Sequence, residues 1–324
     1  MILCFRHWLF LVLLAAIVMP QAATAADSNP DDADFAIQGE YVGHKTIDGQ
    51  ASRWGVQVIA LGKGAFRAVA YPGGLPGDGW NEKEKRTAEG KLQDGVAVLN
   101  TADGDVIKIH DGKYEAFHSS GDQYGTLEKV SRKSPTLSAK PPAGAVVLYG
   151  GPDDVDQWKG GKASDEGWLM QGVTSNATFQ SFTLHVEFLL PFMPEARGQG
   201  RGNSGCYMQG RYEVQMLDSF GLSGENNECG GVYSIAKPRI NMCYPPLSWQ
   251  TYDVEFTAAK FADGKKVENA HMTVRHNGIL VHENLDLTHA TTASPLKEGP
   301  EPGPVYLQNH GNPVRYRNIW IVAK

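Results

Sequence analysis

The sequence predicts an all-β protein, in which a small antiparallel β-domain precedes a larger antiparallel sandwich. Gly 37 and Pro 18 together make up about a sixth of the 324 residues, which indicates many turns between short strands. Apolar and polar residues alternate in many short runs, and no segment keeps a 3.6-residue period for more than two turns. A hydrophobic fraction of 41% against 20% charged residues excludes wholesale disorder.

The charge balance argues against nucleic-acid binding. Lys+Arg 30 against Asp+Glu 36 gives a formal net charge of -6 and a sequence pI of about 5.9. A nucleic-acid backbone is normally met by a basic patch, and the chain has no dense run of Lys and Arg.

The first 25 residues have the layout of a secretory signal peptide. Arg6 and His7 precede the apolar run Trp8–Met19, and Ala23-Thr24-Ala25 forms a cleavage box. The apolar run is too short to span a bilayer comfortably, which disfavours the alternative of an uncleaved anchor. We therefore expect an exported chain, periplasmic or extracellular, with no membrane span after cleavage. Residues 27–34 are expected to form a disordered acidic leader.

Residues 35–130 are predicted to form the small β-domain. Strands are expected at 54–60, 66–71, 96–99, 106–109 and 114–117. Asp-Gly pairs stand between the later strands, where glycine reaches positive φ at no steric cost and closes hairpins. The pattern favours a barrel-like domain of unknown role. Residues 131–144 (SRKSPTLSAKPPAG) have the composition of a semi-extended linker.

Residues 145–324 are predicted to form the larger sandwich. Phe182, Leu184, Val186 and Phe188 alternate with polar neighbours, as expected of a strand with one face in a core. Further strands are expected at 252–256, 272–276, 279–282, 305–310 and 316–322.

Three cysteines remain once the signal peptide is removed. Cys229 and Cys243 are a plausible disulfide pair, and Cys206 is expected to be a buried thiol. No CxxC or HxxxH spacing is present, so no metal site or cofactor is predicted. Calcium is left open, because Asp153-Asp154-Val155-Asp156 offers oxygen ligands; a solvated acidic turn is the alternative.

An ordered series of motifs over roughly the last 180 residues resembles the 3-keto-disaccharide hydrolase family. The series is GNSGCY at 202–207, YEVQMLD at 212–218, GGVY at 230–233, WQTY at 249–252, HNG at 276–278, LQNHG at 307–311 and RYRNI at 315–319. The resemblance implies a concanavalin-like jelly roll, the fold of laminarinase-type glucanases and legume lectins. It also implies a carbohydrate substrate. The N-terminal domain lies outside the match.

Strand alternation places candidate catalytic groups on one surface. Glu213 and Gln215 share a face opposite the apolar Val214, so they are expected on the concave surface, where a jelly roll holds glycans. The same argument puts Gln308 and His310, together with Tyr306, on one face of a late strand. Asp218 has the other parity and reaches this surface only through a bulge or at the strand end; otherwise it anchors the following turn.

Four further residues are candidates for substrate binding. Asn203 and Ser204 either place polar groups at the rim or satisfy their own turn. Tyr233 and Trp249 either stack against a pyranose ring or pack in the core.

The chemistry expected of this surface differs from that of an ordinary glycosidase. A glycosidase needs two carboxyl groups across the scissile bond, and the E-x-D-x-x-E strand of laminarinase-type glucanases is absent, with Gln215 at the position of the middle Asp. A 3-keto sugar needs one base, because its carbonyl acidifies the C2 proton. We expect Glu213 or His310 to be this base, with Gln215 and Gln308 as hydrogen-bond donors. The alternative is a lectin-like protein of the cell envelope that binds glycan without cleaving it.

Overall fold

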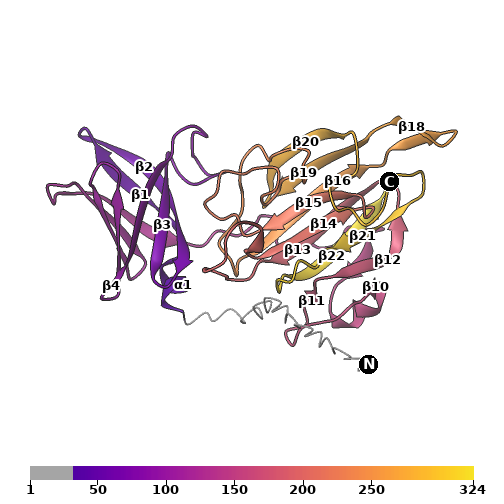
Figure 1. Ribbon diagram of the computed structural model, residues 1–324, viewed down its shortest axis with the longest axis horizontal. Helices are drawn as coiled ribbons and strands as arrows, with labels where there is room; N and C mark the ends of the chain where they lie inside the picture. Colours follow the sequence, from indigo (N-terminus) through magenta and orange to yellow (C-terminus); the bar gives the residue numbers. More distant parts are fainter. Residues whose placement is uncertain (1–31) are drawn as a thin grey trace, which may run out of the picture.

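The computed structural model describes residues 32–324 and is built almost entirely from antiparallel strands (Figure 1). A β-barrel near the N-terminus and a two-sheet sandwich lie side by side, with the barrel in indigo and purple and the sandwich in magenta to yellow. The predicted all-β fold, with a small β-domain before a jelly-roll sandwich, is confirmed. The predicted signal peptide, residues 1–25, lies outside the described residues.

Eight strands close the barrel in chain order, each pairing with the next and β8 pairing with β1. The strands are β1 (Gly39–Ile47), β2 (Gln50–Gly62), β3 (Ala65–Pro72), β4 (Arg86–Gln93), β5 (Val96–Thr101), β6 (Val106–His110), β7 (Lys113–Phe117) and β8 (Gln123–Val130). The Asp-Gly pairs at 94–95 and 111–112 form hairpin turns with positive φ at both residues. The barrel-like shape expected from the sequence is therefore a closed barrel.

A short helix, α1 (Ala33–Ile37), precedes the first strand. The Asp32 side chain caps it by accepting a hydrogen bond from the Asp34 amide, and the Asp34 carboxylate accepts one from the Gly64 amide. Residues 32–34 were expected to belong to a disordered leader, so that prediction is wrong for these three residues. The reason is local, because an Asp at the N-cap begins a helix whose Ile37 packs into the barrel core.

The sandwich consists of two main antiparallel sheets. The five-stranded sheet has the order β10 (Trp158–Lys159), β12 (Val173–Phe179), β21 (Gly303–Leu307), β14 (Asn203–Met208) and β15 (Tyr212–Leu217). The facing sheet has the order β11 (Leu169–Met170), β22 (Arg315–Ala323), β13 (Phe182–Leu189), β16 (Trp249–Thr257), β19 (Ala270–His276) and β20 (Ile279–Leu287), with β9 (Val146–Tyr149) paired to β22. A hairpin of β17 (Lys260–Ala262) and β18 (Lys265–Glu268) and the 3-10 helices Pro152–Gln157 and Gly198–Gly200 complete it.

The sandwich core forms between the two sheets from alternate residues of each strand. Leu184, Val186, Val214, Met216 and Val254 are at most 1% exposed and belong to one cluster of buried side chains. Residues of the opposite parity point to the outer faces, and these outer faces carry the polar groups that matter for function.

The barrel wall packs against the sandwich core through Ile59, Val69 and Tyr71 of β2 and β3. Around this contact, Arg132 donates to both carboxylate oxygens of Glu40 at 2.7 and 2.6 Å. The contact is therefore apolar at its centre. The Arg132–Glu40 ion pair has little exposure to water and joins β1 to the segment after β8, and the Arg132 guanidinium lies over the Tyr244 ring of the sandwich at 4.9 Å.

The predicted linker, residues 131–144, lies against the outer face of the larger sheet. The Ser134 hydroxyl hydrogen-bonds with that of Thr251 at 2.6 Å, and the Thr136 hydroxyl donates to Asp253 at 2.7 Å. The Ser138 amide donates to Glu187 at 2.5 Å. The composition of the segment predicted a semi-extended linker but did not reveal that polar groups of the sheet bind it.

A buried ionic cluster lies beneath this segment. His185 contacts Asp253 at 2.6 Å, and Arg317 donates to Glu187 at 2.7 Å. Burial alone raises the pKa of Glu187, but hydrogen bonds from His185, Asn318, Arg317 and the Ser138 amide outweigh it and lower the pKa to about 2. These interactions keep Glu187 ionised although its side chain is inaccessible to water.

The cysteines of the described chain lie in the interior of the sandwich. Cys206, Cys229 and Cys243 are all buried and free, so the suggested Cys229–Cys243 bridge is not present, while the buried thiol at Cys206 is confirmed. Asp154 accepts hydrogen bonds from the Gly150 amide and the Gln157 side chain within the 3-10 helix at 152–157. Within residues 32–324, no group of three or more acidic, His or Cys side chains is arranged to hold a metal ion.

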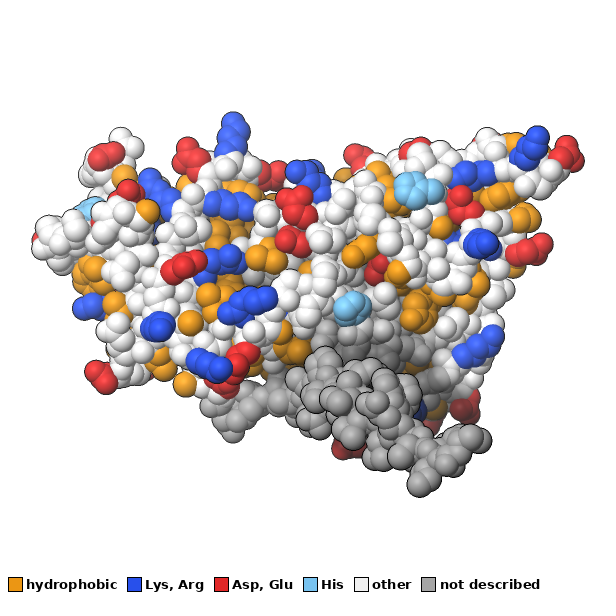
Figure 2. Space-filling model, viewed as in Figure 1, with side chains coloured by type: hydrophobic (Ala, Val, Ile, Leu, Met, Phe, Trp, Pro, Cys, Tyr) orange, Lys and Arg blue, Asp and Glu red, His pale blue; other side chains and the backbone are white. Residues whose placement is uncertain are grey.

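The surface shows no segregation of charge on the face drawn in Figure 2, where basic and acidic side chains are interspersed over both domains. In the described part of the chain, no helix has the length and hydrophobicity needed to cross a membrane.

Candidate active site

The candidate site lies on the outer face of the five-stranded sheet, where β21, β14 and β15 run side by side. Glu213 and Gln215 project from β15 on the side opposite the core residues Val214 and Met216, as the alternation predicted. Both are nonetheless buried, because residues 226–236 pack beside β15. The backbone N–H of Gln215 donates to the Gly231 carbonyl, and Val232 forms an isolated β-bridge with Val214.

Among the described residues 32–324, Glu213 supplies the one carboxyl group of the polar cluster formed on this face with Tyr207, Gln215, Gln308 and Asn203. It is 2% exposed, and its Oε2 accepts a hydrogen bond from the Tyr207 hydroxyl at 2.7 Å. That hydroxyl in turn accepts one from the Gln308 amide at 3.1 Å, which links β21, β14 and β15 in one chain of contacts. Burial raises the pKa of Glu213 to about 7, against the lowering effect of the Tyr207 hydroxyl. The carboxyl group therefore takes up and releases protons near neutral pH.

Space for the Glu213 side chain comes from the missing side chain of Gly205 on β14. A Cβ at position 205 would stand 2.0 Å from Glu213 Oε1 and 2.7 Å from its Cδ. The φ of Gly205 is not positive, so steric room alone requires glycine here.

We expect Gly205→Ala to displace the Glu213 carboxylate and to lower activity about 10²-fold, since small misplacements at a reacting centre have effects of that size. Steady-state turnover measures this effect. Gly200→Ala is the matched control, because a Cβ there meets no atom within 4 Å and its φ is not positive. Equal activity of the two variants would contradict the role given to Gly205.

An amide network adjoins the carboxyl group. Gln215 Nε2 donates to Gln199 Oε1 at 3.0 Å, and Asn203 Nδ2 donates to the Gln199 carbonyl at 2.8 Å. Asn203 Oδ1 is buried and has no hydrogen-bond partner among residues 32–324. Buried acceptors of this kind are normally satisfied, so the network has unused capacity to bind hydroxyl groups.

Aromatic rings border the same face. Tyr306 lies 5.3 Å from Tyr207, centroid to centroid, and both rings stand on neighbouring strands. Tyr233 is half-buried, and its amide donates to the Glu213 carbonyl at 3.2 Å. Amides, one carboxyl group and aromatic rings together suit the hydroxyl groups and apolar faces of a sugar.

Three predicted site residues are placed elsewhere. Ser204 points into the sandwich, where its hydroxyl donates to the Gln308 carbonyl and contacts the Tyr316 hydroxyl, so it holds strands together. Asp218 follows the end of β15, five residues from Glu213 or roughly 16 Å along an extended strand, and is paired with Arg201. His310 is exposed in a turn, because β21 ends at Leu307; the expectation that a strand continues to His310 is wrong.

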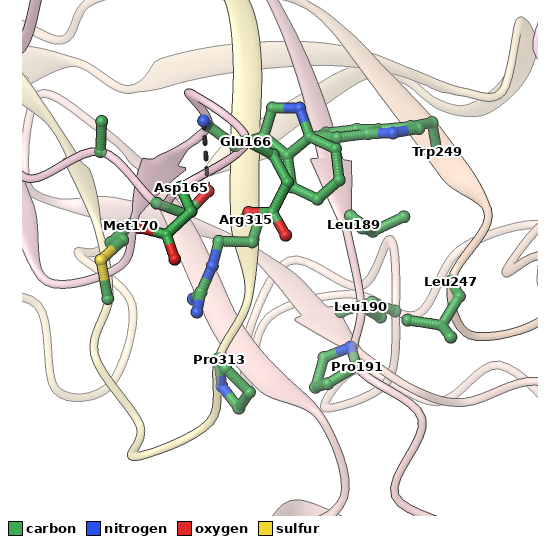
Figure 3. A pocket seen from close by; sticks show the side chains of 13 residues that line it. Asp165, Glu166, Met170, Leu189, Leu190, Pro191, Leu247, Trp249, Pro313 and Arg315 are labelled. Atoms are coloured by element: carbon green, nitrogen blue, oxygen red, sulfur yellow. Dashed lines mark hydrogen bonds between the residues drawn. The ribbon is translucent and has the colours of Figure 1, made fainter. Parts of the chain in front are cut away.

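Trp249 belongs to the other sheet and so does not share the Glu213 site. It lines a separate cavity of about 750 Å³ at the ends of β11, β13, β16 and β22, shown in Figure 3. Its ring meets Trp168 edge to face at 5.2 Å and lies under the Arg317 guanidinium at 4.0 Å. Trp249 is therefore not packed in the sandwich core. Its stacking against a pyranose ring stays a prediction, which applies to this cavity and not to the face that carries Glu213.

Two site residues were not among the sequence-based candidates. Tyr207 on β14 is paired directly with Glu213 on β15, so the two side chains lie on the same face of the sheet. The alternation of residues along β14 could have indicated this position. Gln199 reaches the site from the 3-10 helix Gly198–Gly200, and no periodicity of the sequence indicates it.

A two-sheet jelly roll with a buried carboxyl group, amides and tyrosines on one outer face is an arrangement that suits a carbohydrate-acting protein. Residues 144–322 match the family described as the 3-keto-alpha-glucoside-1,2-lyase-like domain. The chain belongs to this family.

One solved structure is similar to more than half of this chain. A candidate glycosyl hydrolase from Parabacteroides distasonis is 30% identical, with a TM-score of 0.51, over 56% of this chain and 85% of that one. A second candidate glycosyl hydrolase from the same organism is 17% identical over 58% of this chain and 92% of that one, with a TM-score of 0.37, and is too distant to support an argument. No curated protein matches the chain.

Proposed function

We propose that the protein cleaves 3-keto glycosides, with Glu213 as the general base, and that it does so outside the cytoplasm after export. The observation that supports the proposal is the buried Glu213 carboxyl group, whose pKa of about 7 matches that of an effective base at neutral pH. A glycoside hydrolase-like role fits the family and the 30% identical neighbour; the oxidised substrate is our inference.

The reaction needs one base and no second carboxylate. The Glu213 carboxylate takes the proton from C2, and the electron pair of the C2–H bond delocalises onto the oxygen at C3. The C1–O bond then breaks, C1 and C2 become doubly bonded, and the aglycone oxygen takes the proton that Glu213 removed from C2, which restores the carboxylate. Addition of water returns a hydrogen to C2 and a hydroxyl group to C1, so the sum is hydrolysis.

Neighbouring donors have positions suited to the developing negative charge. Gln308 and Tyr207 form a hydrogen-bonded chain that ends on Glu213, and Gln215 carries a second amide on the same strand as the base. Donors of this type stabilise an enolate oxygen most strongly where water is excluded. We assign Gln215 and Gln308 to the keto oxygen and Tyr207 to the proton exchange around Glu213.

The test compares a 3-keto glucoside with its unoxidised parent, by product analysis after incubation with the purified protein. Cleavage of the keto sugar alone supports the proposal. Cleavage of the parent at a comparable rate overturns the requirement for a keto group. Saturable binding of either sugar without cleavage identifies a lectin-like protein instead.

The pH dependence of the reaction follows from the same group. The base must be ionised, so kcat/KM is expected to rise with pH and to level off above about 7, the pKa of Glu213. An ordinary exposed glutamate would give the corresponding rise near pH 4.3. A pH–rate profile from 4 to 9 distinguishes the two, and a plateau already reached at pH 5 would exclude Glu213 as the base.

A further inference from the structure

The barrel contains a cavity of about 330 Å³ at the end of its interior remote from α1. Its walls include Ala68, Ala70 and Ala88, whose small side chains leave the space open. Eight-stranded barrels are just wide enough to hold one small ligand when their interior side chains are small. The size also falls within the range of small-molecule sites.

Lys45 projects into this interior from β1. It points inward like Tyr41, four residues earlier on the same strand, and is 4% exposed. Its aliphatic stem packs against Gly125, where an added Cβ would lie 2.8 Å from Lys45 Cγ. The ammonium group lies 4.7 Å from the centroid of the Trp54 ring and 5.2 Å from that of Tyr114. Aromatic faces stabilise a cation only partly.

This ammonium group has no hydrogen-bond acceptor within the described part of the chain. Among residues 32–324, Lys45 Nζ has neither a hydrogen-bond acceptor nor a carboxylate within ion-pair distance. Burial lowers the pKa of Lys45 to about 8, helped by the charge of Arg86 and opposed by that of Asp105. Buried charges are normally paired, so the group is available to an incoming anion.

Charged side chains of both signs line the cavity, and the two cations among them have no ion-pair partner among residues 32–324. Arg86 lines the same cavity, and its guanidinium lies 5.3 Å from the Trp54 ring centroid, with no ion pair within the described chain. Two carboxylates, Asp103 and Asp105, line the cavity as well. Asp105 is engaged by the Tyr124 hydroxyl and lies 3.6 Å from His118, and Asp103 is exposed to solvent. Two cations without an ion-pair partner among the described residues therefore face one cavity. Besides the alanines, its lining carries the hydroxyl groups of Thr87, Thr101, Tyr114 and Tyr124 and the two carboxylates.

We propose that the N-terminal barrel binds a small organic carboxylate, with the carboxylate on Lys45 and Arg86 and a compact apolar or ring body against the alanines and Tyr114. This site is separate from Glu213 and does not depend on the proposed reaction.

The test is isothermal titration of the full-length mature protein at low salt. Benzoate and glucuronate are the anionic probes, and benzyl alcohol and glucose are their uncharged counterparts. We expect saturable binding of at least one carboxylate and none of its neutral counterpart. Binding of benzoate or of glucuronate distinguishes an apolar from a sugar body. Absence of binding by both acids, or equal binding of acid and neutral probe, overturns the proposal.

Variants test the assignment to Lys45. Lys45→Met keeps the stem and removes the charge, and it is expected to weaken binding about tenfold or more. Lys108→Met is the matched control, because Lys108 also stands over an aromatic ring, Phe117 at 5.1 Å, but is exposed on the outside of the barrel. Arg86→Gln, at an exposed position, provides a second variant if Lys45→Met fails to fold. Unchanged affinity in Lys45→Met and Arg86→Gln overturns the assignment.

Discussion

Glu213→Gln is expected to lower turnover of a 3-keto glycoside by about 10²- to 10⁴-fold, the usual contribution of a general base. Gln has nearly the shape of Glu, and its carbonyl oxygen still accepts the hydrogen bond from Tyr207, so the fold is expected to persist. Because the buried carboxyl group is costly to ionise, the variant is also expected to be at least as stable as the parent above pH 7. The rate of product formation measures the loss of turnover, and thermal unfolding above pH 7 measures the change in stability.

The matched control is Glu255→Gln. Glu255 also stands on an outer strand face of the sandwich, but on the other sheet and exposed to solvent. We expect it to retain activity within about twofold, as surface substitutions away from functional features usually do. Turnover by Glu213→Gln equal to that of Glu255→Gln would exclude Glu213 as the base.

Asp218→Ala is expected to destabilise the protein by about 3–5 kcal/mol, the range for removing one partner of a buried ion pair. Asp218 is 2% exposed and accepts a hydrogen bond from Arg201 Nε at 2.5 Å. Arg201 also donates to the Ala60 carbonyl of the barrel, so the pair lies where the two domains meet. Without Asp218, a guanidinium that is 6% exposed keeps its charge and loses its counter-ion.

Denaturant unfolding provides the measurement. The exposed pair Lys260–Glu268 has a comparable separation of 2.7 Å, with side chains 65% and 59% exposed. Glu268→Ala is therefore expected to cost less than about 1 kcal/mol. A similar loss in the two variants would show that burial does not amplify the Asp218–Arg201 interaction.

Strand alternation predicted the central part of the site because a strand has a period of two residues. The parity of Glu213 and Gln215 against Val214 held, and so did the grouping of Gln308 with Tyr306 on the outer side of the sheet. The fold was predictable for the same reason, together with the Asp-Gly turns that close the barrel hairpins.

Alternation failed where a strand ends or is buried on both faces. All six residues of β14 are buried, so burial preference does not distinguish Asn203, which faces the site, from Ser204, which faces the core. His310 follows the end of β21, where parity no longer applies. Trp249 has the outward parity of a site residue but belongs to the other sheet, and only tertiary pairing determines which sheet a strand joins.

The segment at 131–144 has a consequence for how the protein divides into modules. The family match begins at residue 144. The backbone N–H of Ser138 nevertheless donates a hydrogen bond to the Glu187 carboxylate of the sandwich, and the Thr136 hydroxyl donates one to the Asp253 carboxylate. A fragment cut at the family boundary would open these carboxylates to water and leave them short of donors. We therefore expect the cooperative folding unit to be larger than the homologous module, because it includes the connecting segment, and we expect unfolding of the sandwich to be linked through this segment to that of the barrel.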